Sequence, residues 1–165
     1  MPNPSYILIA SPTQPNRLKN VFASGPETIA STLERPPVFR YAGWSLETLD
    51  QARIVGGEFL EVKNGPRKTI RIFEDGTLLF RGDAGPDFLG WGRDEVTFPE
   101  SPQLHSLAAI EVTTLFLYFY ATLIPHFERP VSDIRFVLKL TDAKIGEKFM
   151  HIVPYPVNSV RWHFR

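Results

Sequence analysis

The sequence of 165 residues contains no cysteine. This absence excludes disulfides, thiolate nucleophiles, iron–sulfur clusters and cysteine zinc sites. The chain also has no excess charge of either sign, because 18 basic and 18 acidic side chains cancel. A protein that is basic over its whole surface, as many nucleic-acid binders are, is therefore excluded, whereas a local basic patch is not.

The common motifs of nucleotide and metal chemistry are missing as well. No GxxxxGK[ST] or GxGxxG occurs, and Gly90-Trp91-Gly92 is too short to replace either. No GxSxG elbow marks a nucleophilic serine. No HxH, HxxH or HExxH pattern connects the four histidines, which are His105, His126, His151 and His163. We therefore expect no cofactor and no metal, and we lean towards a protein without enzymatic activity.

The chain has few features of an exported or membrane protein. Its N-terminus, MPNPSYILIASP, lacks the basic region and long apolar run of a signal peptide, so a cytoplasmic location is predicted. One segment, residues 107–124, is apolar apart from Glu111. Its uncharged part has 13 residues, whereas a membrane span needs about 20. The segment therefore predicts a core helix that the rest of the protein covers on nearly every side.

Short apolar runs, separated by 15 prolines, predict several strands and one further helix. The short helix is expected from Pro26 to Glu34, with Pro26 in its first turn. Strands are expected at residues 6–10, 53–62 (bent at its two glycines), 68–74, 77–81, 88–91, 134–140 and 149–153, the last pairing with 134–140. This order predicts an α+β fold in one globular domain, 1–165, with a mainly antiparallel sheet, one long buried helix and a short N-terminal helix.

The clearest local signal is Asp75-Gly76, which separates two β-rich runs. Such a pair favours a two-residue type I′ hairpin turn. That turn places Ile72 opposite Leu79 on one face, and Phe73 opposite Leu78 on the other. Because both faces then carry large apolar groups, the hairpin is predicted to be covered on both sides.

The best acidic cluster lies in the segment RGDAGPDFLGWGRDEVTF. A loop that gathers carboxylates can serve acid–base or metal chemistry, and a distant histidine, His105 or His151, would complete a small hydrolase or transferase. The alternative is ordinary turn chemistry, since aspartate beside glycine and proline caps local amides. The acidic residues of this loop, which runs from Asp83 to Glu95, are Asp83, Asp87, Asp94 and Glu95.

Glu111 is the one charged residue of the long apolar run. A buried carboxylate without a partner is very costly, so Glu111 must reach either water or a donor. We favour a structural pair, and the functional alternative is an acid that lines a pocket.

Two basic patches are candidates for contact with nucleic acid. One comprises Arg67-Lys68 and Arg71, and the other is the terminal sequence RWHFR. The second interleaves cations with aromatics, which suits phosphates and stacked bases together. A terminal strand with solvated charges would have the same pattern. The binding residues that we expect are Trp91, Arg93, Arg161 and Trp162.

Several stretches together resemble one bacterial region. They are SYILIASPTQPNRLKNVF, VFRYAGWSLET, IVGGEF, KTIRIFEDGTLLF, DFLGWG and LAAIEVTTLFLYFY, and the resemblance spans roughly residues 5–142. They are similar to the part that follows the Schlafen AlbA-type domain in many proteins named for ATP or DNA binding. The resemblance implies an accessory or C-terminal domain. The AlbA-type domain has no counterpart in this chain, so none of its binding residues is carried over.

The predicted function is a non-enzymatic binding or interaction module. It would work with a protein partner or a fused domain, as an accessory domain of a nucleic-acid-associated bacterial protein. Direct contact with nucleic acid has weaker support, no membrane partner is expected, and the oligomeric state is open. Large aromatics near glycine-rich turns, around Trp44 and Trp91, make good interface anchors, although filling a core is their commoner use.

Overall fold

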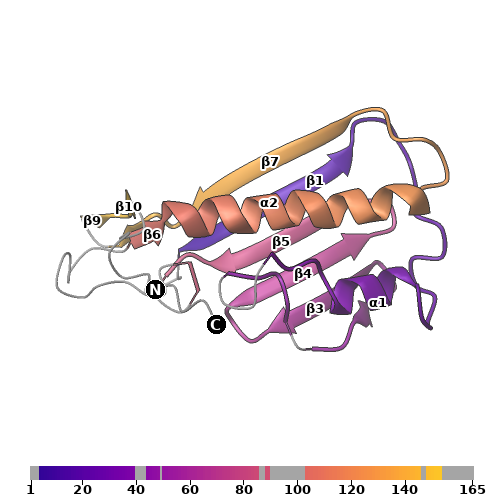
Figure 1. The fold of residues 1–165 in the computed structure, drawn as a ribbon, viewed down its shortest axis with the longest axis horizontal. Helices are drawn as coiled ribbons and strands as arrows, with labels where there is room; N and C mark the ends of the chain where they lie inside the picture. The colour runs from indigo at the N-terminus through magenta and orange to yellow at the C-terminus, as the bar shows by residue number, and fades with distance from the viewer. Residues whose placement is uncertain are drawn as a thin grey trace, which may run out of the picture.

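The computed structural model describes residues 4–39, 44–48, 50–85, 88–89, 103–145 and 148–153. Its centre is a six-stranded antiparallel sheet crossed on one face by a long helix, α2 (Ser106–Leu123) (Figure 1). The strands lie in the order β2 (Arg53–Val55), β3 (Phe59–Asn64), β4 (Lys68–Phe73), β5 (Leu78–Asp83), β1 (Ser5–Pro12) and β7 (Ile134–Thr141). The predicted α+β fold is confirmed.

Strand β1, from the N-terminal part of the sequence, lies between two strands that come much later in the chain. It pairs with β5 on one side and with β7 on the other, both antiparallel. Among the residues that the structure describes, four short strands lie outside the main sheet. They are β6 (Gln103–His105), paired in parallel with β10 (His151–Val153), and β8 (Lys144–Ile145), paired with β9 (Lys148–Phe149). The prediction that residues 149–153 pair with 134–140 is therefore wrong.

The short helix α1 (Ile29–Glu34) begins later than the sequence predicted. Thr28 is its N-cap, and its hydroxyl accepts a hydrogen bond from the Ser31 N–H at 3.3 Å. Glu27 has a φ of 61°, which places it outside the helix. A threonine that satisfies a free N–H of the first turn is the stronger start signal here, and Pro26 precedes the cap.

The β4–β5 hairpin forms where it was predicted, but its register differs by one residue. Ile72 pairs with Leu78 and Ile70 with Phe80, so Ile72 does not lie opposite Leu79, nor Leu78 opposite Phe73. The loop accordingly contains residues 74–76 and not only Asp75-Gly76. This shift leaves Ile70, Ile72, Leu78 and Phe80 on one face, where all four are fully buried.

The turn geometry accounts for that shift. Gly76 has a φ of 82°, whereas Asp75 is not at positive φ, as a type I′ turn would require. The Asp75 carboxylate accepts the Thr77 N–H at 2.8 Å, and the Gly76 N–H donates to the Phe73 carbonyl at 3.0 Å. These contacts match a three-residue loop that ends in a left-handed residue. A Cβ on Gly76 would also lie 2.1 Å from the ring of Phe127. Glycine is therefore needed there both for its positive φ and for this close approach.

The φ values of a type I′ turn occur instead at Gly56 and Gly57, at 60° and 74°. The Glu58 N–H closes this turn on the Val55 carbonyl at 3.0 Å. The predicted single strand 53–62 is therefore two strands, β2 and β3. Residues Phe88 and Leu89 form a turn and not a strand, and residues 90 and 91 lie outside the described part of the chain.

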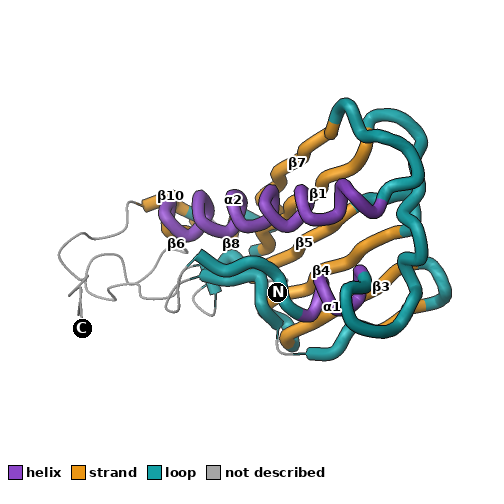
Figure 2. The backbone as a smooth tube through the Cα atoms, turned by 45° about the vertical axis from the view of Figure 1, so that its right-hand side comes forward, coloured by secondary structure: helices purple, strands orange, loops and turns teal. Residues whose placement is uncertain are grey.

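One face of the sheet and one face of α2 form the core (Figure 2). The buried side of the helix carries Ala108, Val112, Leu115, Phe116, Phe119, Tyr120 and Leu123, with Glu111 among them. Each large side chain buried here contributes about 2 kcal/mol of transfer free energy. The core is thus built on the predicted long helix, which ends in a 3₁₀ turn, η1 (Ile124–His126).

The prediction that this helix is covered on nearly every side is wrong. Ile110, Leu117 and Tyr118 are 63%, 45% and 60% exposed. Within the described residues, one helical segment, Ser106–His126, is long and apolar enough to cross a bilayer, with a mean hydropathy of 1.7. The count of uncharged residues underestimated that length. The helix nevertheless packs on the sheet through its inner side, and 44% of its most apolar window is buried.

The sheet also has an open face. In the described part of the chain, α1 and α2 both lie on the inner side of the sheet (Figures 1 and 2). Along β4 and β5, the residues that point the other way are half-buried or exposed, except Asp83 at the end of β5. The prediction that the hairpin is covered on both sides is therefore wrong, and the outer face carries the residues considered next.

Candidate functional site

The outer face of the sheet presents cations in rows that cross the strands. Side chains alternate between faces along a strand, so residues paired in register share a face. One row runs through Lys63, Thr69, Arg81, Ile7 and Lys139. Its three cations stand on every second strand, which places their Cα atoms about 10 Å apart.

A second row crosses the same face one step further along the strands. It passes through Arg53, Glu61, Arg71, Leu79, Ile9 and Val137. The half of this row on β2, β3 and β4 is charged, and the half on β5, β1 and β7 is apolar and half-buried. Apolar surface and fixed charge thus lie side by side on one sheet face.

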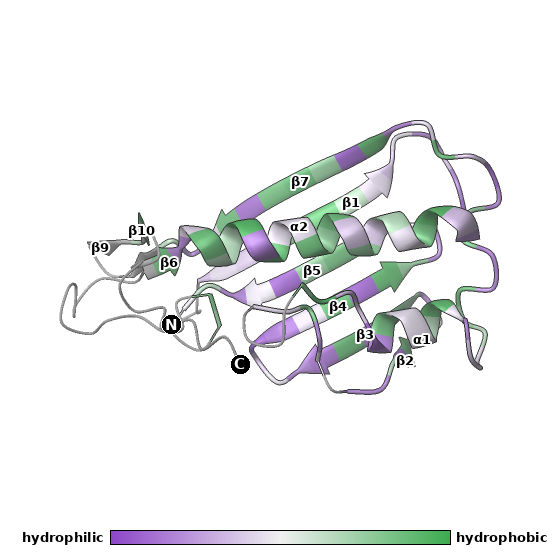
Figure 3. Ribbon diagram, in the orientation of Figure 1, coloured by the Kyte–Doolittle hydropathy of each residue, from purple (hydrophilic) through white to green (hydrophobic). Residues whose placement is uncertain are grey.

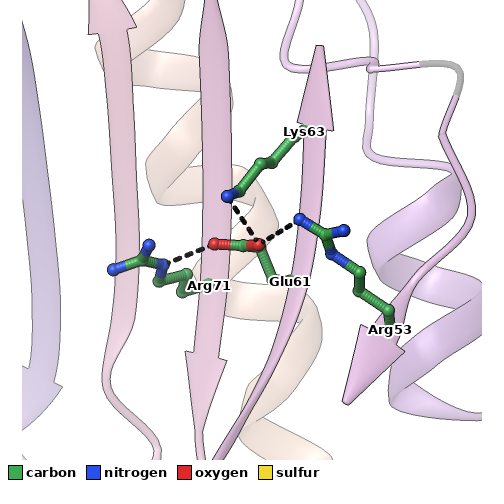
Figure 4. A network of polar contacts seen from close by, with 4 residues as sticks. All are labelled: Arg53, Glu61, Lys63 and Arg71. Carbon is green, nitrogen blue, oxygen red and sulfur yellow. Dashed lines mark hydrogen bonds and ion pairs between the residues drawn. The ribbon is translucent and has the colours of Figure 1, made fainter. Parts of the chain in front are cut away.

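Glu61 organises the charged half of the row (Figure 4). Its carboxylate accepts hydrogen bonds from Arg53 and Arg71, both at 2.8 Å, and pairs with the Lys63 ammonium at 3.1 Å. The Glu61 side chain is 2% exposed, whereas those of Arg53, Lys63 and Arg71 are 60%, 39% and 36% exposed. One buried anion therefore holds three cations at the surface in defined positions.

The environment of Glu61 sets its charge state. Burial on its own would raise the pKa of this carboxyl, but the hydrogen bonds from Arg53, Arg71 and Lys63 lower it further than burial raises it. The net pKa lies below the ordinary glutamate value of 4.5. Glu61 is therefore ionised at neutral pH, and the group as a whole keeps an excess of positive charge.

Aromatic rings adjoin this group. The rings of Phe59 and Phe73 lie 5.0 Å apart between centroids, at an angle of 45°. The Arg71 guanidinium stands 4.9 Å from the centroid of Phe59, a cation–π contact. Both phenylalanines are half-buried. A flat ring of a ligand could pack against these phenylalanines while the Arg71 guanidinium contacts a negatively charged group attached to that ring.

The charge of this face is one-sided although the whole chain is neutral. Two carboxylates, Glu61 and Asp83, occupy outward positions on the described strands of the sheet. Six cations occupy such positions, namely Arg53, Lys63, Arg71, Arg81, Arg135 and Lys139. The net charge of the whole chain, which is zero, does not reveal this local excess of positive charge.

A second polar cluster lies in the interior, at the end of the sheet where α2 begins. Lys68 is 7% exposed, and its ammonium donates to the carbonyls of Ser45, at 3.0 Å, and Glu47. The same ammonium lies 5.2 Å from the centroid of the Phe88 ring. Burial lowers the pKa of Lys68 to about 8. The contacts of this lysine fasten the segment 44–48 to the sheet, which is a structural use.

His105 and Asp83 lie at the same end of the molecule. The His105 N–H donates to the Leu89 carbonyl at 3.2 Å, and the Leu89 N–H donates to the Asp83 carbonyl at 3.3 Å. The ring of His105 is 6.1 Å from that of Trp44. Asp87, Asp94 and Glu95 lie outside the described residues, and His151 is on β10 beside β6. Within the part that the structure describes, no group of three or more His, Asp or Glu could hold a metal ion.

The structure bears unevenly on the sites predicted from sequence. Trp91, Arg93, Arg161 and Trp162 lie outside the described residues. Glu111 is 8% exposed on the inner side of α2. Trp44 is 5% exposed, and its indole N–H donates to the Phe88 carbonyl at 2.7 Å, so it serves the core and is not an open anchor.

The predicted patch of Arg67, Lys68 and Arg71 does not form one surface. Lys68 points into the core, Arg67 stands in the exposed turn between β3 and β4, and Arg71 is on the outer face. Neighbours along a strand point to opposite faces, so a run of cations in sequence splits between them. The useful signal was the alternation of cations with apolar residues in 68–73, 78–83 and 134–141.

Described residues also line a shallow hollow of about 290 Å³ between the segment 19–29 and η1, and its polar residues include Asn20, Glu27, Thr28 and His126. This hollow is open, and its described lining residues form no cluster of charges comparable to that on the outer sheet face. No protein-family model, curated protein or solved structure matches the chain.

Proposed function

We propose that this chain is a binding module that holds single-stranded nucleic acid on the outer face of its sheet. It would act without catalysis, as an accessory domain of a nucleic-acid-associated bacterial protein. The observation that carries the proposal is the row of cations Lys63, Arg81 and Lys139, on a face that no described helix covers and that carries the Phe59–Phe73 pair two rows further along β3 and β4.

Two chemical features support a nucleic acid as the ligand. Fixed guanidinium and ammonium groups bind phosphates, and their release of counterions contributes much of the affinity. Half-exposed aromatic and aliphatic side chains give bases a surface on which to stack. Arg81 is well suited to the first role, because its guanidinium is already oriented by two hydrogen bonds to the Ser5 hydroxyl, at 3.1 and 3.0 Å.

A single strand fits this face better than a duplex. Bases in a duplex are stacked on one another. A duplex therefore presents only its phosphates to a flat sheet. A single strand can place phosphates on the cationic row, and bases on the apolar half of the neighbouring row and on the Phe59–Phe73 pair beyond it. If four phosphates are neutralised, the logarithm of the affinity falls with that of the salt concentration with a slope of about −3.

The test is fluorescence anisotropy with a labelled single-stranded oligonucleotide and with the matching duplex, over a range of salt concentrations. Wild-type protein should bind the single strand more tightly. Arg81→Glu should weaken that binding about tenfold, the equivalent of about 1.4 kcal/mol. The matched control is Arg35→Glu, which makes the same change of charge at an exposed residue at the end of α1, off the outer face.

Two results would contradict the proposal. One is an absence of binding by wild-type protein at low salt. The other is an equal loss of affinity in Arg81→Glu and Arg35→Glu, because it would mean that only the net charge matters. A preference for duplex would also reject the stacking part of the argument.

A further inference from the structure

The two edges of the main sheet are protected very differently. Strand β2 forms one edge, has three residues, and presents Arg53. Strand β7 forms the other edge, has eight residues, and contains neither proline nor glycine. A long regular edge exposes a row of unpaired backbone groups, which attracts another strand unless something blocks it.

Apolar side chains accompany the open edge of β7. Ile134, Phe136 and Leu138 are 42%, 38% and 48% exposed. They point to the inner side of the sheet, as their register partners on β1 do, but α2 lies over β1 and leaves them uncovered (Figure 3). These three side chains form an exposed apolar strip. Phe116 of α2 reaches only the border of this strip, where its ring centroid lies 6.1 Å from that of Phe136.

We propose that a second copy of this chain pairs with β7, antiparallel, across a two-fold axis at Phe136. The two main sheets would then form one continuous sheet. The two exposed strips would lie side by side and bury part of each other, and both basic faces would lie on the same side of the dimer. The inference does not depend on nucleic-acid binding.

The backbone has the direction that this pairing needs. The Thr13 N–H donates to the Asp133 carbonyl at 3.1 Å, so the backbone groups of residue 133 point towards β1. Backbone direction alternates along a strand, so Arg135, Val137 and Lys139 also turn theirs inwards. The N–H and C=O groups of the even-numbered residues of β7, Phe136 among them, therefore point to the open edge.

Charge and strand overlap together favour one register, because an axis at Leu138 would oppose no acid with a base and an axis at Ile134 would pair almost none of β7. With Phe136 on the axis, Ile134 lies opposite Leu138 of the second copy, and Asp133 lies opposite Lys139. Opposite charges across an antiparallel pair are favourable, and like charges are not. An axis at Val137 would place Arg135 opposite Lys139, and an axis at Arg135 or at Lys139 would oppose two identical cations.

A single introduced cysteine tests this register cleanly, because the chain has none of its own. The Phe136→Cys variant should give a disulfide-linked dimer on mild oxidation. In that register, its two Cα atoms lie about 5.5 Å apart, within the range for a disulfide. The control is Leu138→Cys, whose two copies would stand about 13 Å apart along the strands and should stay unlinked.

The charge pair gives a second test that leaves the apolar strip intact. Sedimentation equilibrium should show a wild-type dimer, and Lys139→Glu should raise its dissociation constant about tenfold by facing two acids. The double variant Asp133→Lys with Lys139→Glu should restore the wild-type value. Ile54→Arg, at the 53% exposed position on the opposite edge, is the control and should change nothing.

Three outcomes would overturn the proposal. They are a wild-type monomer at every soluble concentration, a crosslink at Leu138→Cys as strong as that at Phe136→Cys, and a double charge variant no tighter than Lys139→Glu alone. Each contradicts either the edge or the register, whether or not the protein binds nucleic acid.

Discussion

The two faces of the main sheet are made by alternate residues of the same strands, yet they are different environments. The inner face, under α2, holds fully buried aliphatic and aromatic side chains such as Ile70, Leu78 and Phe80. The outer face holds half-buried apolar groups together with a one-sided set of cations. The difference suggests that stability depends mainly on the inner face, and that the outer face is free to serve binding.

The sharpest test of this division uses two leucines that are adjacent in β5. Leu78→Ala on the inner face should lower the free energy of unfolding by about 3 kcal/mol, because it leaves a cavity in a packed core. Leu79→Ala on the outer face should lower it by about 1 kcal/mol, since the site is half-buried and opens to solvent. Urea denaturation measures both. Equal losses would mean that another element covers the outer face.

Two cations of β4 extend the comparison to charge. Lys68 points inwards and its pKa is lowered to about 8 by burial, below the ordinary 10.5. Between these two values the unfolded chain binds the extra proton and the folded protein does not, so stability rises with pH there. The gain from pH 8 to pH 10.5 should approach about 3 kcal/mol.

The Lys68→Met variant should lose that dependence, and denaturation at the two pH values measures it. The matched control is Arg71→Met on the outer face of the same strand, which should keep the wild-type slope. A slope that is unchanged in Lys68→Met would show that the ammonium reaches water more easily than its contacts imply.

Glu61 is the anion that holds three cations of the outer face. Its removal should therefore affect stability and nucleic-acid affinity in opposite directions. Glu61→Gln should lower the free energy of unfolding by about 2 kcal/mol, because charge-assisted hydrogen bonds are lost. Affinity for a single-stranded oligonucleotide should rise severalfold, since the face loses its buried negative charge. Loss of both stability and affinity would indicate that the order of the cations matters more than their charge.

The pH dependence of stability provides a further check on Glu61. A carboxyl whose folded pKa is depressed stabilises the protein above its unfolded value and loses this contribution as the pH falls through the folded one. Wild-type protein should therefore lose stability below about pH 4.5. In Glu61→Gln that part of the loss should be smaller, and thermal melts at acidic pH measure the difference.

Sequence patterns predicted the architecture because hydrophobic periodicity is a local signal. The long helix, β1, β4, β5 and β7 all occur close to where they were expected. Two hairpin turns were less predictable, since Asp75-Gly76 and Gly56-Gly57 each allow more than one turn. At Asp75-Gly76 the turn must also fit the ring of Phe127, which packs against Gly76. A distant contact of that kind leaves no trace in the local sequence.

The candidate site was harder to predict than the fold. The patches considered from sequence were runs of neighbouring cations, but alternation along a strand separated Lys68 from Arg71. The cationic row of Lys63, Arg81 and Lys139 comes from three strands that are far apart in the chain. It becomes visible only when register is known. Glu61 likewise has no distinctive motif, because its partners lie on neighbouring strands as well as its own.

The smallest expected effect concerns the Phe59–Phe73 pair. Phe73→Leu keeps an apolar side chain of similar volume at a half-buried position, so the free energy of unfolding should change by less than about 1 kcal/mol. Affinity for single-stranded nucleic acid should fall about threefold to tenfold, because the ring against which a base stacks is gone. Phe22→Leu, at a half-buried position packed against the core, is the matched control and should bind as wild type does. If Phe73→Leu also binds as tightly as wild type, the rings of the outer face only fill space, and the cations alone would account for any binding.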